Sequence, residues 1–324
     1  MLKIGFVLSP GFQIMSLAAA SAFEYANLVS GEQRYGIELL SESGGALRNS
    51  LGIPIGTVPL GEADHDTLIF GTGVTVEPTS PAIISFAREC IASVRRIASI
   101  CLGAFILADA GILDSRRATT HWLAARKLQA RYPKVRVEED RIFIVDGPVW
   151  TSAGMSAGID MALGMVEKDF GVELARSIAQ RLVLYQRRGG GQSQHSELLA
   201  LDPKSDRIQN ALIYARSHLR SPLTVEELAE AAHLSTRQFS RAFHAETGQT
   251  PAKAVENLRL EAARVMMEQT RHPIDVVAAE TGFADRERMR RAFVRAFGQP
   301  PQAIRRSARM SWLADQGAQS TARA

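Results

Sequence analysis

Two segments near the end of the chain share one pattern, and this repeat limits the fold more than any other feature of the sequence. The first segment runs from Leu223 to Pro251 and the second from His272 to Pro301. In each, apolar residues recur at helical spacing, a short turn follows, and a second helical pattern ends at a glycine before Gln and Pro. The repeat predicts two helix pairs, joined by a long helix over residues 252–270.

The second helix of each pair is predicted to have one buried face and one exposed face. Its N-cap is Ser235 or Asp285, and its inner face carries Phe239 and Phe243 or Met289 and Phe293. A helix anchored in this way presents its outer side chains to the major groove of DNA. The sequence therefore predicts an all-α domain with two helix-turn-helix units. Two helical hairpins with merely solvated basic faces are the alternative, and the matched caps and stops argue against it.

Charge is distributed unevenly along the chain. Residues 204–310 hold 18 Lys and Arg against 12 Asp and Glu, whereas the whole chain has a net charge of only +4. A basic second part joined to a slightly acidic first part suggests a polyanionic partner for the second. We expect that partner to be double-stranded DNA.

Residues 206–306 resemble the AraC-type family of bacterial transcriptional regulators, with the ending "GF…F…R.F…FG..P" among the more specific marks. The resemblance implies two recognition helices that enter successive segments of the major groove. By position, base-reading roles fall to Arg237, Ser240, Arg241, Arg286, Glu287, Arg290 and Arg291. Thr224 and Gln249 are placed to donate to phosphates from helix ends. RNA polymerase is a further candidate partner.

The first 185 residues alternate between strand and helix patterns. Strands are expected at 3–9, 36–41, 66–71, 96–101 and 149–154, and helices at 17–28, 82–93, 104–110 and 159–170. This alternation predicts an α/β domain, a flavodoxin-like layered fold on a mostly parallel sheet. The glycine-rich stretch from Arg187 ends the pattern. We therefore expect a sensor and dimerisation domain at 1–186, a linker at 187–203, the DNA-binding domain at 204–310, and a disordered tail at 311–324.

A cysteine stands where the strand at 96–101 gives way to a helix. The run "SICLGAF" places Cys101 at a sharp turn, with small residues after it and His121 twenty positions on. Helix N-terminal amides favour a thiolate, so the pKa of Cys101 is expected to be lowered. The Leu102 amide could face a bound oxygen. Taken alone, Cys101 and His121 are more often inert packing residues, and their joint placement is what suggests a site.

Residues 2–185 resemble the class I glutamine-amidotransferase-like superfamily, in the PfpI-like branch of intracellular proteases and small-molecule hydratases. The matching segments are "FGTG" at 70–73, "ASICLGA" at 98–104, "ATTHW" at 118–122 and "TSAGMSAGIDMALGMVE" at 151–167. Fusion of such a domain to an AraC-type reader, and the segment "GGQSQHSELL" at 190–199, resemble the GlxA-like subfamily of regulators.

One position departs from the superfamily pattern. Active members carry an acid near the first helix, where this chain has Ser16, and Glu24 lies about two turns further on. Cys101 and His121 are therefore interpreted as vestigial, and the domain as a degenerate enzyme that binds a small effector. The resemblance implies a nitrogen-containing metabolite. The expected pocket comprises Cys101, Leu102, His121, Gly71, Gly73, Thr151, Ser152 and Phe12, with Trp122 as a second aromatic candidate.

Two rival functions stay open at this point. The first domain could be a hydrolase or hydratase that uses Cys101, or a dimerisation scaffold without a ligand. No cofactor is expected, and the seven histidines lack the spacing of a metal site. Only two cysteines and no long apolar run are present, which favours a cytoplasmic protein with no membrane contact. A homodimer is expected as well.

Overall fold

The computed structural model describes residues 1–61, 64–184, 188–190, 194, 201, 203–270 and 272–306. The chain divides into two compact units, with the division after Gln194. The predicted tail at 311–324 and most of the predicted linker at 187–203 lie outside the described residues. None of the described helices is long and apolar enough to span a membrane.

The first unit is built on an eight-stranded sheet with the order β3-β4-β2-β1-β5-β6-β10-β9. Its strands are β1 (Leu2–Leu8), β2 (Tyr35–Ser41), β3 (Ser43–Arg48), β4 (Pro54–Pro59), β5 (Thr67–Gly71), β6 (Arg96–Ile100), β9 (Phe143–Asp146) and β10 (Val149–Ser152). The central strands pair in parallel, and only the outermost pairs, β3 with β4 and β9 with β10, are antiparallel. The mostly parallel α/β fold is therefore confirmed. A second, two-stranded sheet joins β7 (Arg117–Ala118) to β8 (Arg136–Val137).

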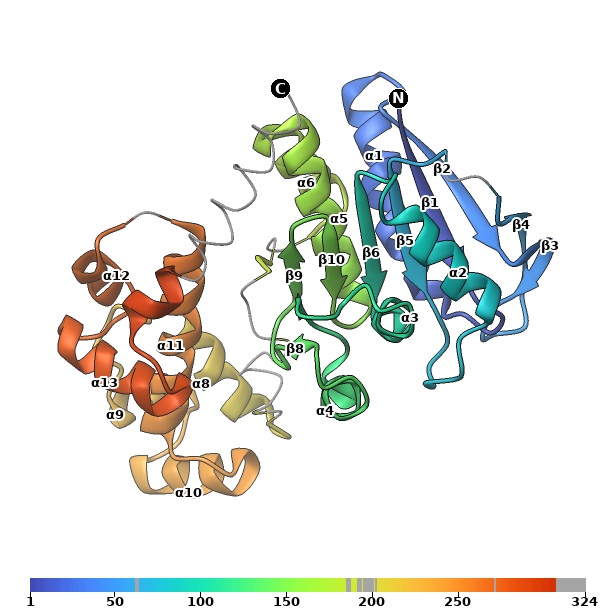
Figure 1. Ribbon diagram of the computed structural model, residues 1–324. Helices are drawn as coiled ribbons and strands as arrows, with labels where there is room; N and C mark the ends of the chain where they lie inside the picture. Colours follow the sequence, from blue (N-terminus) through green and yellow to red (C-terminus); the bar gives the residue numbers. More distant parts are fainter. Residues whose placement is uncertain are drawn as a thin grey trace. The chain divides into compact units, whose positions relative to one another are not determined.

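Helices cover both faces of the large sheet (Figure 1). They are the 3-10 helix η1 (Ile14–Ala19), α1 (Ala20–Ser30), α2 (Pro81–Cys90), α3 (Gly103–Asp109), α4 (Trp122–Arg131), α5 (Met155–Phe170) and α6 (Val172–Arg181). α1, α5 and α6 pack together on one face, and α2 and α3 lie on the other. The central strands β1, β5, β6 and β10 therefore form a middle layer that is buried on both sides, which explains their near-continuous apolar sequences.

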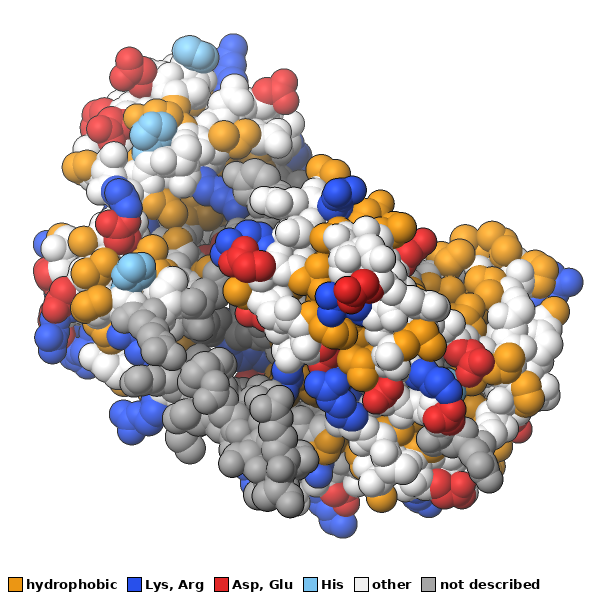
Figure 2. Space-filling model, turned by 90° about the horizontal axis from the view of Figure 1, so that it is seen from above, with side chains coloured by type: hydrophobic (Ala, Val, Ile, Leu, Met, Phe, Trp, Pro, Cys, Tyr) orange, Lys and Arg blue, Asp and Glu red, His pale blue; other side chains and the backbone are white. Residues whose placement is uncertain are grey.

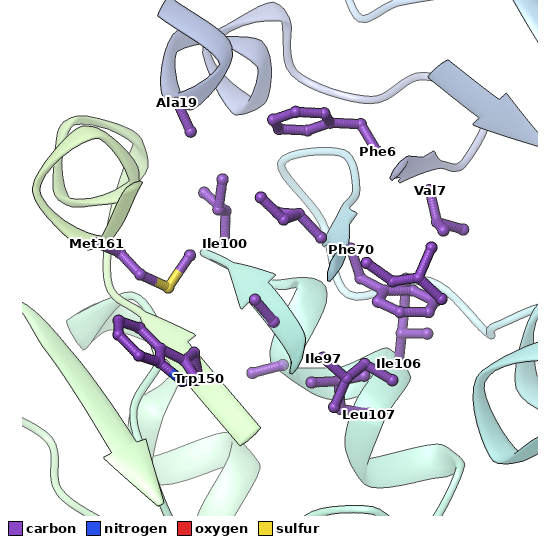
Figure 3. Packing of buried hydrophobic residues seen from close by; sticks show 14 of the residues in the cluster. Phe6, Val7, Ala19, Phe70, Ile97, Ile100, Ile106, Leu107, Trp150 and Met161 are labelled. Atoms are coloured by element: carbon purple, nitrogen blue, oxygen red, sulfur yellow. The ribbon is translucent and has the colours of Figure 1, made fainter. Parts of the chain in front are cut away.

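Side chains of β6 point to both faces of the sheet and pack against the helices on each side (Figure 3). Ile100 points towards Ala19 and Met161 on one side, whereas Ile97 lies near Ile106 and Leu107 of α3 on the other. Both isoleucines are fully buried. Burial of a side chain of this size stabilises the fold by about 1.5–3 kcal/mol. β6 thus fixes the position of the turn that follows it.

All the regular elements described in the second unit are helices. These are α8 (Asp206–Ser217), α9 (Val225–Ala231), α10 (Thr236–Thr247), α11 (Pro251–Gln269), α12 (Ile274–Glu280) and α13 (Arg286–Phe297). α9 with α10, and α12 with α13, form the two predicted helix pairs. Ser235 and Asp285 cap their second helices, and Gly248 and Gly298 end them in left-handed conformation, as predicted.

Helix α11 connects two separate hydrophobic clusters. Its first half contributes Leu258 to the cluster around Phe239 and Phe243, and its second half contributes Ala263 to the cluster around Met289 and Phe293. All four large side chains are fully buried. The predicted inner faces are confirmed, and each helix pair has its own small core against a shared helix.

Candidate functional site

Cys101 occupies a strained turn between β6 and α3. Its φ of 55° lies in the left-handed region that non-glycine residues rarely adopt. Its amide donates to the carbonyls of Ser152 (3.1 Å) and Ala153 (2.9 Å). A side chain at Gly103 would collide with the carbonyl oxygen of Phe70. The predicted sharp turn from strand to helix is therefore present, and it depends on glycine two residues after the cysteine.

The thiol of Cys101 does not have the lowered pKa that the sequence suggested. Only 7% of the residue is exposed. Burial raises the pKa of the thiol to about 11, and a hydrogen bond from the Leu102 amide offsets this only in part. The sequence argument counted the helix N-terminus and left out the loss of solvent. At neutral pH the group is therefore a neutral thiol.

His121 is the N-cap of α4, and this role fixes its ring. Its Nδ1 accepts a hydrogen bond from the Leu123 amide at 3.3 Å. Its neutral ring then carries the proton on Nε2. The ring packs against Gly154 at the start of α5, and stacks on Trp122 with 5.8 Å between centroids. The cap therefore engages the Nδ1 of His121, the nitrogen that the Leu123 amide contacts.

The cysteine and histidine segments meet through Thr120. Its hydroxyl donates to the Cys101 carbonyl at 2.7 Å. The Thr151 hydroxyl accepts from the Thr119 amide at 2.9 Å, and the Ser152 hydroxyl donates to the Ser99 carbonyl at 3.3 Å. The structure thus brings the predicted pocket segments together, and their hydroxyls already have partners inside the protein.

The remaining predicted pocket residues surround the same strand ends. Phe12 is fully buried, and a Cβ on Gly71 would lie 2.9 Å from the Cβ of Ser16. A Cβ on Gly73 would lie 3.1 Å from the carbonyl oxygen of Gly11. Ser16 is buried on η1 and lies against Gly71 at the end of β5, whereas Glu24 is exposed on α1. Both glycines therefore permit close packing in this region.

Gln194, which the sequence reasoning did not single out, binds the loop that carries His121 (residues 119–123, the histidine loop). Its Nε2 donates to the carbonyls of Thr120 (2.9 Å) and Glu139 (2.8 Å), and its Oε1 accepts from the Trp122 amide (2.9 Å). Its own amide donates to Asp140 at 2.8 Å. The only sequence signal was its place in the segment 190–199. This residue links the end of the first unit to the loop that carries His121.

The start of the predicted linker is also attached to the first unit. The Arg188 guanidinium donates to buried Asp160 on α5 at 2.8 Å, and the Arg188 amide donates to the same carboxylate at 2.9 Å. A side chain at Gly190 would collide with the carbonyl oxygen of Phe143. Arg188, Gly190 and Gln194 therefore all lie against the first unit.

Helix α10 presents basic side chains that have no partner within the described part of the chain. Arg237 and Arg241 are exposed, and no hydrogen bond or ion pair involves either of them there. Ser240 lies between them and is half-buried. A capping box between Ser235 and Gln238 fixes the start of the helix. The predicted outer face of α10 is thus open to an external partner.

Helix α13 differs because two of its predicted base-reading residues pair with each other. Arg290 and Glu287 form a two-pronged ion pair, with a shortest separation of 2.7 Å. The hydrogen bond from Arg290 lowers the pKa of Glu287, and the same bond raises the pKa of Arg290. Arg286 and Arg291 are exposed and have no such partner among the described residues.

The two predicted phosphate donors already have local roles. The Thr224 hydroxyl accepts from the Glu227 amide at 3.2 Å in the capping box of α9. The Gln249 side chain accepts from Asn257 at 3.3 Å. Each therefore helps to define a helix end.

Comparison with known proteins decides the family. A helix-turn-helix domain model matches residues 228–307, and the DJ-1/PfpI family model matches residues 55–168. The HTH-type transcriptional regulator CdhR of Pseudomonas aeruginosa is 30% identical over 306 residues, which cover 93% of this chain and 90% of that protein. The chain belongs to the AraC-type transcriptional regulators with a DJ-1/PfpI domain.

A second curated regulator supports this family assignment, and a solved structure shares the fold of the first unit. The HTH-type transcriptional regulator GlxA of Rhizobium meliloti is 30% identical over 326 residues, covering 94% of this chain and 95% of that protein. A crystal structure of an AraC family transcriptional regulator from Pseudomonas putida covers 56% of this chain and 100% of its own, with a TM-score of 0.52 and 23% identity. The regulator therefore combines a DJ-1/PfpI fold with a helical DNA-binding unit, as the sequence predicted.

Proposed function

We propose that this regulator recognises operator DNA through the exposed faces of α10 and α13. The base-reading candidates are Arg237, Ser240, Arg241, Arg286, Glu287, Arg290 and Arg291, with Thr224 and Gln249 near phosphates. The observation that carries the proposal is the open pair Arg237 and Arg241, on a helix whose other face is buried by Phe239 and Phe243. Guanidinium groups in this arrangement suit the acceptors of guanine in the major groove.

The test begins with genome-wide mapping of bound sites, which supplies the operator. Arg241→Ala combined with Arg291→Ala should abolish the footprint of the full chain on that operator, because each lost contact costs about 1–3 kcal/mol. Arg126→Ala, which removes one exposed charge from the first unit, serves as the control. A footprint that persists in the double variant would contradict the assignment of these helices.

The first unit is proposed to sense a small, nitrogen-containing metabolite without catalysis. Its contacts would come from the Cys101 thiol, the Leu102 amide, His121, and the segments at Gly71, Gly73, Phe12, Thr151 and Ser152. A buried, protonated thiol is poorly suited to nucleophilic attack, and the Nδ1 of His121 is engaged in a helix cap. Ser16 in place of an acid supports the same interpretation.

A thermal-shift screen of the full chain against amino acids and betaines tests the sensor. A compound that binds the folded state must raise the unfolding midpoint. The strained turn at Cys101 favours a second candidate function for the first unit, that of a Cys-dependent hydrolase or hydratase. Turnover that disappears in Cys101→Ala would establish that rival.

Signal transfer is proposed to use the segment that leaves the first unit. Gln194 bonds to the histidine loop, so a ligand that moves this loop changes the anchoring of the linker at 187–203. The proposed domains are 1–186 and 204–310. A ligand shifts their arrangement only if it binds one arrangement more tightly.

A homodimer in the cytoplasm completes the proposal, with RNA polymerase as a further partner. Hydrophobic side chains gather at the right-hand end of Figure 2, over the end of the first unit that holds β2, β3 and β4 in Figure 1. The exposed residues Ile37, Leu51, Ile53 and Val58 belong to these strands and their connections. Such a patch suits a contact with a second copy, which sedimentation of the full chain would measure.

A further inference from the structure

A basic hollow lies within the second unit, between its two helix pairs. It has a volume of about 680 Å³ and is bounded by the loop before α9, by α11 and by the start and middle of α13. Its charged lining consists of Arg220, Arg259, Arg288, Arg291, Arg295 and Glu256. Five cations and one carboxylate give the hollow a strong positive surplus.

Three of these arginines have partners that hold the walls in place. Arg259 donates to the carbonyls of Leu219 (3.2 Å) and Ser221 (2.6 Å). Arg220 pairs with Glu280, and Arg295 lies 2.8 Å from Glu256, which also bonds to Lys253. These contacts tie the loop before α9 and helix α13 to the rest of the unit.

The other two arginines provide the charge that an external group can use. Arg288 has only a distant contact of 3.8 Å with Asp285, and both side chains are more than half exposed. Arg291 is exposed, and no hydrogen bond or ion pair involves it within the described residues. The hollow therefore presents two cations with little internal compensation.

The floor of the hollow is a close backbone contact. A side chain at Gly282, in the turn between α12 and α13, would collide with the carbonyl oxygen of Leu219 and lie 2.7 Å from Arg259. Its φ of 77° also requires glycine. The two helix pairs therefore meet without intervening side chains, which leaves the arginines as the walls of a preformed depression.

Helix α13 carries this basic stripe and helix α10 does not. Arg288, Arg291 and Arg295 recur at a spacing that places them along one side of α13. At the matching positions, fifty residues earlier, α10 has Gln238, Arg241 and Ala245. Guanidinium groups around a concave surface suit the anionic oxygens of a phosphodiester better than the neutral edges of bases.

We propose that the hollow holds the sugar–phosphate backbone of the operator, with Arg288 and Arg291 as its phosphate contacts. This inference rests on the proposed DNA binding and changes the role of Arg291 from reading a base to positioning the duplex. Arg288 and Arg291 then supply affinity that does not depend on sequence, whereas Arg237 and Arg241 of α10 contribute to sequence discrimination.

The test measures dissociation constants of the full chain for the mapped operator and for an unrelated duplex over a range of salt concentrations. Arg291→Ala should weaken binding to both duplexes by the same factor and reduce the magnitude of the salt slope by about 1. Arg291→Lys should keep most of that slope, because it keeps the charge. Arg241→Ala is the matched variant on α10, and it should lower the ratio between the two affinities.

Each other outcome points to a different failure. If Arg291→Ala lowers the affinity ratio and leaves the salt slope unchanged, Arg291 reads a base and the inference is wrong. If the parent protein binds neither duplex, the proposed function itself fails. Replacing chloride by inorganic phosphate at equal ionic strength distinguishes a free anion from a DNA strand. We expect no extra loss of DNA affinity, and a loss in the parent that is absent in Arg291→Ala would show that the hollow captures the free anion.

Discussion

The candidate pocket of the first unit and the exposed face of α10 treat their polar groups in opposite ways. Around Cys101, the hydroxyls of Thr120 and Ser152 and the Nδ1 of His121 have partners within the same unit. On α10, Arg237 and Arg241 have none among the described residues. The polar groups around Cys101 stabilise the loops of their own unit, whereas the arginines of α10 are available to a partner of opposite charge. A resemblance to an enzyme is therefore a weaker guide to activity here than the state of the polar groups.

The largest expected effect tests how tightly the pocket region is packed. Gly103→Ala places a methyl group against the Phe70 carbonyl, so the first unit should lose about 3 kcal/mol or more of unfolding free energy. Gly56→Ala is the control, since its Cβ would have nothing within 4 Å. Calorimetry of both variants measures the change. A Gly103→Ala protein as stable as the parent would show that the packing can relax around the added methyl group. The pocket region would then not be tightly packed, contrary to the comparison made above.

A smaller effect concerns the reactivity of the Cys101 thiol. Because burial raises its pKa to about 11, the thiolate is scarce at neutral pH. Its alkylation rate should therefore rise about tenfold per pH unit between roughly pH 8 and pH 10. Mass spectrometry of the modified peptides separates Cys101 from Cys90, whose pKa burial also raises to about 11. A rate for Cys101 that is already constant at pH 8 would indicate an activated nucleophile and favour the enzyme.

The smallest effect sharpens the comparison at Gln194. Gln194→Ala removes four side-chain hydrogen bonds to the histidine loop and to Glu139, at about 1 kcal/mol each. Hydrogen exchange at residues 119–123 should become faster, while the helices of the second unit stay unchanged. The matched control is Gln129→Ala, which removes bonds to Val135 and Val137 elsewhere in the first unit. Equal exchange at 119–123 in Gln194→Ala and in the parent would mean that Gln194 does not hold the loop.

Local sequence patterns predicted the features that depend on neighbours in the chain. The N-caps Ser235 and Asp285, the buried Phe239 and Phe243, and the turn at Cys101 all follow from spacing or from a glycine nearby. Strands β3 and β4 at one end of the sheet were missed, because half-exposed strands with glycines lack a continuous apolar run.

Features that depend on distant residues could not be predicted in the same way. The raised pKa of Cys101 reflects the burial that neighbouring elements impose on the thiol. The partners of Gln194 come from segments more than fifty positions away, and the hollow joins three elements that lie far apart in sequence. The spacing of Arg288, Arg291 and Arg295 was visible, but only the hollow gives it a meaning.

The shared helix α11 and the close contact at Gly282 have a consequence for the evolution of the operator. Nineteen residues of helix form a strut of about 28 Å that holds the two helix pairs at a set separation. A base change within one recognised segment costs that contact alone. An inserted base pair between the segments moves the second segment by about 3.4 Å along the duplex and turns it by roughly a tenth of a helical turn. The second segment then loses both its position along the duplex and its angular position relative to the protein. The binding sites of this regulator should therefore vary in base sequence while the spacing between their two recognised segments stays constant.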